Sequence, residues 1–150
     1  MKAQVGPPQW HALLAATAEQ VEELGAAEVA TLKRRWRQQY GEPPPPRSFL
    51  WHCFSFQQHS HLAGPAAVAA YDAQLVGAYV VFFDQAAWGF RCRSKQLPPS
   101  ARLRELAARG ATECRDVYVG QPNLTWAFCL THEPDCGPYF ARAAPVLPSR

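Results

Sequence analysis

Residues 75–83 read LVGAYVVFF, the most apolar run in the chain. A run of nine residues is short for a helix, and its valines and aromatic residues are typical of a β-strand. Because no polar residue alternates with the apolar ones, we expect both faces of the strand to be buried. The run therefore predicts a central strand of a sheet that other elements cover on both faces.

Four other segments predict further strands of this sheet. In residues 88–93, WGFRCR, apolar and polar side chains alternate, so one face of this strand contacts solvent. Residues 115–119 and 124–131 flank the turn residues GQPN, which predicts an antiparallel hairpin. Residues 49–56, FLWHCFSF, are rich in aromatic residues and predict a strand that is covered on both faces. The sheet thus has about five strands, an ordinary number for a domain of this size.

The N-terminal part of the chain predicts two helices. Between residues 10 and 24 the apolar side chains fall on one helical face, and Gly25 then provides a natural helix end. A second helix begins near Ala26, where apolar residues are spaced three and four positions apart. It ends at Gly41 and the prolines of residues 43–46, because proline lacks a backbone donor and locks φ. We expect these prolines to form a stiff connector.

Two shorter helices are predicted in the connections between strands. The first covers residues 66–74 after a proline, and the second begins with Ser100 as N-cap and ends at Gly110. The predicted fold class is therefore α+β, with a mostly antiparallel sheet of about five strands, two N-terminal helices and two connecting helices. The whole chain forms a single domain, with flexible termini at residues 1–9 and 143–150.

The composition is that of a globular protein and excludes several classes. Hydrophobic residues make up 48% of the chain and charged residues 18%, and the net charge is only +3. Nucleic-acid-binding proteins usually have a larger and clustered basic excess, so we expect no nucleic-acid partner. No apolar run approaches the ~20 residues of a membrane span, and the N-terminus lacks the apolar segment of a signal peptide. We therefore expect a cytoplasmic protein without a membrane partner.

The five cysteines show no repeated spacing, and their number is odd. In a protein without a secretion signal, this pattern predicts free thiols and no disulfide. Cys129, His132 and Cys136 are spaced by three and four residues, as some zinc ligands are, but neither C-x-x-C nor H-E-x-x-H occurs. The known glycine-rich loops for nucleotides are also missing. We therefore expect no metal site and no cofactor.

Two motifs resemble those of a known family. Residues 51–55 read WHCFS, which resembles a W-H-x-F-S motif, and residues 131–140 contain T-H-E followed by G-P-Y-F. Residues 116–119, DVYV, and the Thr-Trp pair at 125 and 126 fit the same pattern. From about residue 50 to residue 140 the chain is similar to the bacterial family called domain of unknown function 4275. This resemblance implies a small bacterial cytoplasmic protein and supplies no mechanism.

The His-Glu pair of the second motif is a candidate catalytic site. His132 can act as a general acid or base, because imidazole titrates near neutral pH. Glu133 follows it at the end of the predicted strand, where the alternation of side chains between two faces relaxes. If the two motif-bearing strands are adjacent, His52 meets His132 at this point. His52, His132 and Glu133 are therefore the catalytic candidates.

A structural role is the alternative for the same residues. A nucleophile would have to be Ser55 or Cys53, and neither lies in a nucleophile-elbow sequence. In the structural interpretation His52 forms hydrogen bonds inside the core, and the Thr131 hydroxyl closes a turn. The sequence favours this interpretation over catalysis.

A protein-binding role agrees best with the missing nucleophile, metal ligands and cofactor loop. The predicted binding residues are Trp51, His52, Trp126, His132, Glu133 and Tyr139, and the predicted partner is another protein. A toxin-immunity protein is an example of such a non-catalytic module. The alternative is a small enzyme, of a hydrolytic kind, that uses His132 and Glu133 with His52 as acid–base residues. The sequence predicts no oligomeric state.

Overall fold

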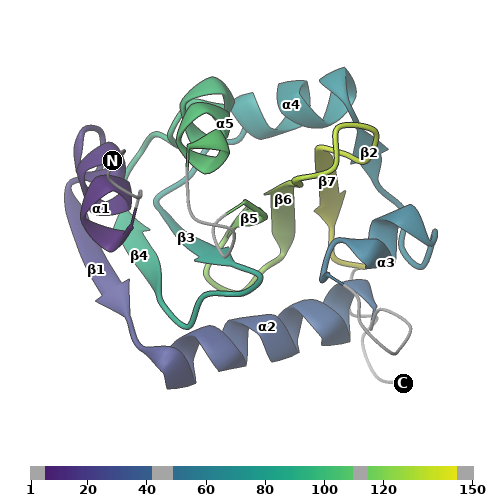
Figure 1. Cartoon of the computed structure of the whole chain (residues 1–150), viewed down its shortest axis with the longest axis horizontal. Helices are drawn as coiled ribbons and strands as arrows, with labels where there is room; N and C mark the ends of the chain where they lie inside the picture. Colours follow the sequence, from purple (N-terminus) through teal and green to yellow (C-terminus); the bar gives the residue numbers. More distant parts are fainter. Residues whose placement is uncertain (1–5, 42–48, 110–114, 145–150) are drawn as a thin grey trace, which may run out of the picture.

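The computed structural model describes residues 6–41, 49–109 and 115–144, which form a seven-stranded sheet and five helices (Figure 1). The strand order is β1-β4-β3-β5-β6-β7-β2, and every neighbouring pair is antiparallel. The predicted α+β class with an antiparallel sheet is confirmed, although the sequence predicted about five strands and four helices. The strands are β1 (Gln20–Leu24), β2 (Leu62–Ala63), β3 (Ala78–Phe83), β4 (Gly89–Arg93), β5 (Val117–Gly120), β6 (Trp126–Leu130) and β7 (Tyr139–Arg142).

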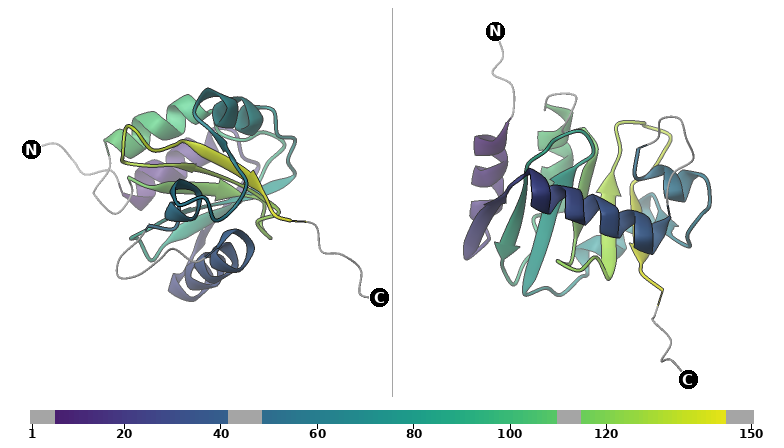
Figure 2. Two further views of the ribbon diagram at one scale, coloured as in Figure 1. Left: turned by 90° about the vertical axis from the view of Figure 1, so that its right-hand side faces the viewer. Right: turned by 90° about the horizontal axis from the view of Figure 1, so that it is seen from below.

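Helices cover both faces of the sheet, as the left view of Figure 2 shows. One face carries α1 (Pro7–Ala15), α4 (Pro65–Asp72) and α5 (Ser100–Ala108). The other face carries α2 (Ala26–Tyr40) and the short α3 (His52–Ser55). Each face therefore has its own hydrophobic core. Within the described ranges, no helix has both the length and the apolar composition that crossing a membrane requires.

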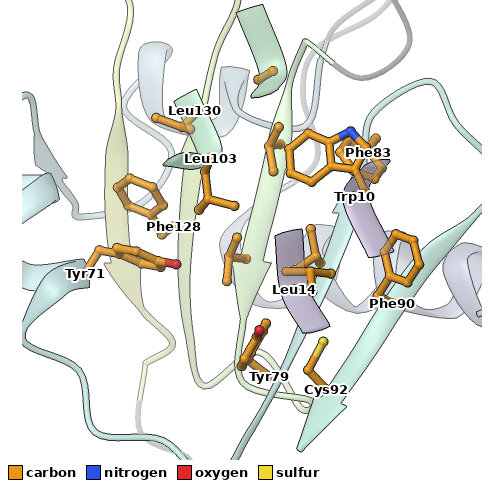
Figure 3. Close-up of a cluster of buried hydrophobic side chains, with 14 of the residues drawn as sticks. Trp10, Leu14, Tyr71, Tyr79, Phe83, Phe90, Cys92, Leu103, Phe128 and Leu130 are labelled. Carbon is orange, nitrogen blue, oxygen red and sulfur yellow. The ribbon is translucent and has the colours of Figure 1, made fainter. Parts of the chain in front are cut away.

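β3 divides its side chains between the two cores. Tyr79, Val81 and Phe83 contribute to the core under α1, α4 and α5, where Figure 3 shows the Trp10 ring against that of Phe83. The alternate residues of β3 belong to the second core, under α2 and α3. Every residue from 79 to 83 is buried, which confirms the predicted internal strand. The strand is shorter than predicted, because pairing with β4 begins only at Ala78 and pairing with β5 at Val80, and Leu75 is 94% exposed.

The predicted first helix is wrong in its second half. α1 ends at Ala15, and residues 20–24 form the edge strand β1, which pairs with β4. Val21 and Leu24 fit a helical stripe by spacing, but the backbone groups of β4 need a partner on this side, and β1 provides it. The second helix is confirmed as α2, whereas the prolines of residues 43–46 lie outside the described residues.

The predicted strand at residues 49–56 is also wrong, because this segment is a turn followed by α3. Its backbone bonds locally, with the amide of Phe56 donating to the carbonyl of His52 at 2.9 Å. Trp51 and Phe54 are nevertheless buried, since α3 packs beside α2 on the sheet. The aromatic content that suggested a strand reflects burial, and packing overrides β-propensity here.

The later elements follow the predictions more closely. β4 and the β5–β6 hairpin are confirmed, while β2 and β7 were not predicted. α4 begins one residue before the predicted helix and ends at Asp72, because Ala73 and the next residues leave the helix. Ser100 is the first residue of α5 rather than its N-cap, and its hydroxyl donates to Asp72 at 3.2 Å. Gly110 lies outside the described residues, and α1 begins at Pro7, within the segment expected to be flexible.

We expect a methyl group at Gly120 to destabilise the sheet. A Cβ atom there would lie 2.8 Å from the Trp126 carbonyl oxygen and 2.8 Å from a Leu124 methyl group. Gly120→Ala should therefore lower the free energy of unfolding by about 1–3 kcal/mol, as overpacking does. The measurement is urea denaturation followed by circular dichroism.

Gly77→Ala is the matched control, because a Cβ atom at Gly77 has nothing within 4 Å. Its free energy of unfolding should stay within about 0.5 kcal/mol of the wild-type value. Equal losses in the two variants would contradict the steric explanation.

Candidate functional site

The candidate site is centred on Asp116, a buried carboxylate that is 3% exposed. Its Oδ1 accepts hydrogen bonds from Trp51 Nε1 and from the His132 amide, each at 3.0 Å. The His132 Nδ1 lies 2.9 Å from Oδ1 and 3.0 Å from Oδ2. One carboxylate thus joins three segments: the start of α3, the start of β5 and the end of β6.

The β5–β6 hairpin explains why Asp116 and His132 meet. Val117 is opposite Leu130 in the antiparallel register, so the residues just before β5 lie beside those just after β6. His132 sits two positions beyond Leu130, where the strand has ended and its side chain can turn toward Asp116. The predicted position of His132 at a strand end therefore agrees with the structure.

The imidazole of His132 lies between two carboxylates. Nδ1 contacts Asp116, and Nε2 is 3.3 Å from Glu133 Oε1. The His132 side chain is 25% exposed, whereas that of Glu133 is 52% exposed. A neutral imidazole carries one N–H and can donate to only one carboxylate, while the protonated ring donates to both. The ring is thus oriented from the core side by Asp116 and contacts a charged, exposed partner on the outer side.

The loop that carries His132 and Glu133 is held by its own hydrogen bonds. The Thr131 hydroxyl bonds to the carbonyl of Glu133 at 3.1 Å and also to the carbonyl of Cys136. The Cys136 amide donates to the carbonyl of Glu133 at 3.1 Å. This arrangement matches the turn that the structural interpretation assigned to Thr131. It fixes the backbone of residues 131–136 before any ligand arrives.

A second carboxylate, the partly buried Asp84, holds the same end of α3. Its Oδ2 accepts a hydrogen bond from the Leu50 amide at 3.0 Å and another from the Tyr118 hydroxyl. The Tyr118 oxygen in turn accepts from the Trp51 amide at 3.2 Å. Burial raises the pKa of the Asp84 carboxyl above 3.8 and that of the Tyr118 hydroxyl well above 10.0. Asp84 and Asp116 together therefore fix the segment that leads into α3.

His52 lies near His132 but forms a separate set of contacts. Its Nδ1 is 2.9 Å from the Ser55 hydroxyl, and its ring centre is 4.1 Å from that of Trp51. Phe49 lies between the two imidazoles, 5.8 Å from His52 and 4.8 Å from His132 between ring centres. Within the described ranges, no hydrogen bond joins the two histidines. His52 and His132 therefore come near each other because α3 packs on the sheet, and not because they lie on two neighbouring strands.

The structure gathers five of the six predicted binding residues and leaves one apart. Trp51 contacts His52, His132 and Tyr139 through its ring, and Glu133 contacts His132. Trp51 and Tyr139 are buried, at 1% and 6% exposed. Trp126 is also buried, at the opposite end of β6, where it packs on Tyr71 and Phe140.

Sequence reasoning missed the two carboxylates and Tyr118. Asp84 directly follows β3 and Asp116 directly precedes β5, so each reads as an ordinary polar residue at a strand end. One signal was present: residues 116–119 belong to the pattern that carries the family resemblance, and they include both Asp116 and Tyr118. A charged residue that directly flanks a buried strand, as Asp116 does, was thus the available sign of a buried carboxylate.

Two thiols near the site, those of Cys53 and Cys129, have little nucleophilic character. Burial raises the pKa of Cys53 to about 12 and also raises that of Cys129 above 9.0. Cys136, in the loop, is partly buried. Cys53, Cys92, Cys129 and Cys136 are free, while Cys114 lies outside the described residues. In the part of the chain that the structure describes, no three His, Cys, Asp or Glu side chains are grouped to hold a metal ion.

We expect His52 to make the stability of the fold depend on pH. Burial lowers its pKa below 6.5, while Asp116 and Glu133 oppose the shift and His132 adds to it. As the pH falls below 6.5, the unfolded chain takes up the proton before the folded chain does, so acid favours unfolding. The stability linked to neutral His52 is present above pH 6.5 and is lost as the pH falls through the lowered pKa.

The measurement is the free energy of unfolding of wild type and His52→Gln between about pH 5 and pH 7.5. The wild-type value should fall more steeply on acidification than that of the variant. Parallel curves would contradict a lowered pKa at His52. The difference between the two proteins removes the contributions of the other titrating groups.

Comparison with known proteins gives a family and no function. No curated protein and no solved structure matches the chain. A family model with the description "Domain of unknown function (DUF4275)" matches residues 45–140. The matched range includes Trp51, Asp116 and His132, and so contains the cluster around the buried carboxylate. The chain therefore belongs to the family of domain of unknown function DUF4275.

Proposed function

We propose that the chain is a non-catalytic, cytoplasmic protein-binding module whose contact surface is formed by residues 52–63, here called the α3–β2 surface. The observation that carries the proposal is a charge-free stretch: residues 49–71 contain no Asp, Glu, Lys or Arg. Phe56 is 56% exposed and Leu62 is 45% exposed within it. Protein interfaces are depleted of charged residues at their centre and enriched in aromatic ones.

The α3–β2 surface is supported from below by the core. Phe54 and Cys53 of α3 are fully buried, and Asp84 and Asp116 hold the residues just before the helix. Figure 2 shows α3 at the β7 end of the sheet, beside the C-terminal end of α2. The ring of Phe56 lies 5.3 Å from that of His52. An exposed aromatic side chain on a fixed support loses little entropy on binding, which suits an interface anchor.

An immunity protein that blocks a toxin is one member of this class and needs a binding surface without catalytic groups. The net charge of +3 provides no electrostatic attraction for a basic toxin, because inhibitors of basic nucleases carry acidic surfaces. Because the α3–β2 surface itself contains no Asp, Glu, Lys or Arg, its partner would present an apolar patch. A genomic neighbour that encodes a toxin would supply the protein to test.

The experiment compares two sets of exposed apolar side chains in binding to a purified candidate partner. The double variant Phe56→Ser, Leu62→Ser should weaken binding by at least about tenfold, as the loss of interface anchors does. Leu75→Ser is the matched control, because Leu75 is exposed but lies outside the α3–β2 surface. Equal affinity of the double variant and the control would refute this surface, and self-association of the wild type would identify a second copy as the partner.

A second candidate is an acid–base enzyme, favoured by the Asp116–His132 pair. A buried carboxylate that orients an imidazole is the arrangement by which many enzymes position a general base. In this candidate His132 transfers the proton, Glu133 stabilises the protonated ring, and His52 assists from beyond Phe49. A panel of activated esters and phosphoesters tests hydrolysis. His132→Asn keeps a donor toward Asp116 and should lose turnover as fully as His132→Ala does, whereas turnover that survives in His132→Asn excludes acid–base catalysis by this ring.

A further inference from the structure

A cleft of about 400 Å³ lies between α5 and the loop from β6 to β7, apart from the α3–β2 surface. Arg104, Ala107 and Ala108 of α5 line one side, and residues 130–134 and 136–138 line the other. Arg115, just before β5, contributes a third part of the wall. Figure 1 shows α5 and the β6–β7 connection at the same end of the sheet. A volume of this size is within the range of small-molecule binding sites.

The cleft has an excess of positive charge. Arg104 and Arg115 are exposed, and neither forms an ion pair with any residue in the ranges 6–41, 49–109 and 115–144. Arg102, on the same helix, instead pairs with Glu105 at 3.7 Å. The one carboxylate that lines the cleft belongs to Glu133, which already contacts the His132 ring. Two guanidinium groups therefore remain available to a ligand from the described part of the chain.

The wall opposite the arginines is preorganised. The Thr131 hydroxyl ties together the carbonyls of Glu133 and Cys136, and Asp116 anchors His132 through both its amide and its ring. Leu130, Pro134 and Pro138 give this wall an apolar character. A ligand that binds here would lose little free energy to ordering of the loop, because the loop is already fixed.

We propose that the cleft binds a small organic anion, in which a phosphate or carboxylate group contacts Arg104 and Arg115 and an apolar body lies against the β6–β7 loop. The planar guanidinium fork can donate two parallel hydrogen bonds to either a carboxylate or a phosphate, so the two anionic groups share this chemistry. A cleft of about 400 Å³ has room for one group of this kind together with a ring-sized body. The site differs from the α3–β2 surface in all of its lining residues.

The experiment is calorimetric titration at constant ionic strength with three probes that share a ring: phenyl phosphate, benzoate and neutral benzyl alcohol. We expect one or both anions to bind and the alcohol to bind much more weakly. The double variant Arg104→Gln, Arg115→Gln should weaken anion binding by at least about tenfold, the effect of losing a charge-assisted hydrogen bond. Phenyl phosphate binding alone assigns a phosphate ligand, and benzoate binding alone assigns a carboxylate.

Arg91→Gln, Arg93→Gln, both on β4, is the control with the same change in net charge. Both arginines are exposed and lie outside the cleft. This variant should bind the anions within about twofold of wild type, because distant surface charges contribute little. An equal loss in both double variants, or equal binding of the neutral probe, overturns the proposal.

Calorimetric binding of the probes also distinguishes this cleft from the proposed α3–β2 surface. Phe56→Ser, Leu62→Ser should bind the probes as wild type does, since neither side chain lines the cleft. Binding is measured without turnover, so failure of the acid–base candidate leaves the result intact. Loss of anion binding in Arg104→Gln, Arg115→Gln with unchanged protein-partner binding would establish two separate sites.

Discussion

Replacing Asp116 with alanine should lower the free energy of unfolding by about 3–5 kcal/mol, the range for breaking a buried charged pair. The carboxylate accepts hydrogen bonds from Trp51 Nε1 and from the amide and ring of His132. Alanine leaves all of these donors without their acceptor. Because Trp51 is only 1% exposed, water cannot replace the carboxylate as the acceptor for its Nε1 without rearrangement. The change therefore weakens both the start of α3 and the end of β6.

Urea denaturation of three variants measures this effect. Asp116→Asn keeps the side-chain shape and one acceptor oxygen, so its loss should be smaller, about 1–2 kcal/mol. Asp135→Ala removes an exposed carboxylate from the same loop region and should change the free energy of unfolding by less than about 0.5 kcal/mol. A loss below about 1 kcal/mol for Asp116→Ala would show that the carboxylate does not hold these segments together.

Replacing Trp36 with alanine should cost a similar amount, about 3–5 kcal/mol, through a cavity in the second core. Trp36 is fully buried, and its ring centre lies 4.8 Å from that of Tyr118, 5.1 Å from Tyr40 and 5.6 Å from Phe54. Its Nε1 also donates to the carbonyl of Leu50 at 3.1 Å. The side chain thus joins α2, α3 and β5.

Circular dichroism in urea is the appropriate measurement, because the change removes a fluorophore. Trp36→Phe keeps a ring but loses volume and the bond to Leu50, so we expect an intermediate loss of about 1–3 kcal/mol. Trp88→Ala is the comparison on the opposite face, where the side chain is only partly buried. Its loss should be smaller than that of Trp36→Ala, and the reverse order would contradict the assignment of Trp36 to the centre of its core.

Both predictions bear on the proposed protein-binding surface. Trp36 bonds to Leu50 and Asp116 bonds to Trp51, so each variant loosens the residues that lead into α3. A binding defect in these variants would follow from displacement of Phe56 and would not identify a contact. The exposed substitutions at Phe56 and Leu62 are therefore the ones that assign the surface.

Strong local patterns predicted most of the elements. The apolar run of residues 75–83 identified β3, and the turn residues between two apolar segments identified the β5–β6 hairpin. The spacing of apolar residues also identified α2. Each of these segments has a single type of periodicity and is bounded by turn or helix-ending residues. The local pattern therefore favours the same element that the tertiary packing requires.

Weaker or ambiguous patterns failed. Val21 and Leu24 fit both a helix and a strand, and their segment became β1 because β4 offered an unpaired edge. Residues 49–56 have the composition of a buried strand but form a turn and α3. Burial selects apolar and aromatic residues in either geometry, so composition alone does not distinguish them.

In the candidate site too, the sequence predicted the local elements but not the contacts between distant segments. The sequence by itself determined the apolar strands, the β5–β6 turn and a histidine at the end of β6. Only the tertiary structure decided that His132 contacts Asp116, sixteen positions away, and that Trp51, sixty-five positions from Asp116, contacts the same carboxylate. These contacts depend on the register of the hairpin and on the packing of α3, which arise from pairing between distant segments. Local periodicity indicates which side chains are buried, whereas the register and packing of distant segments determine which side chains contact one another.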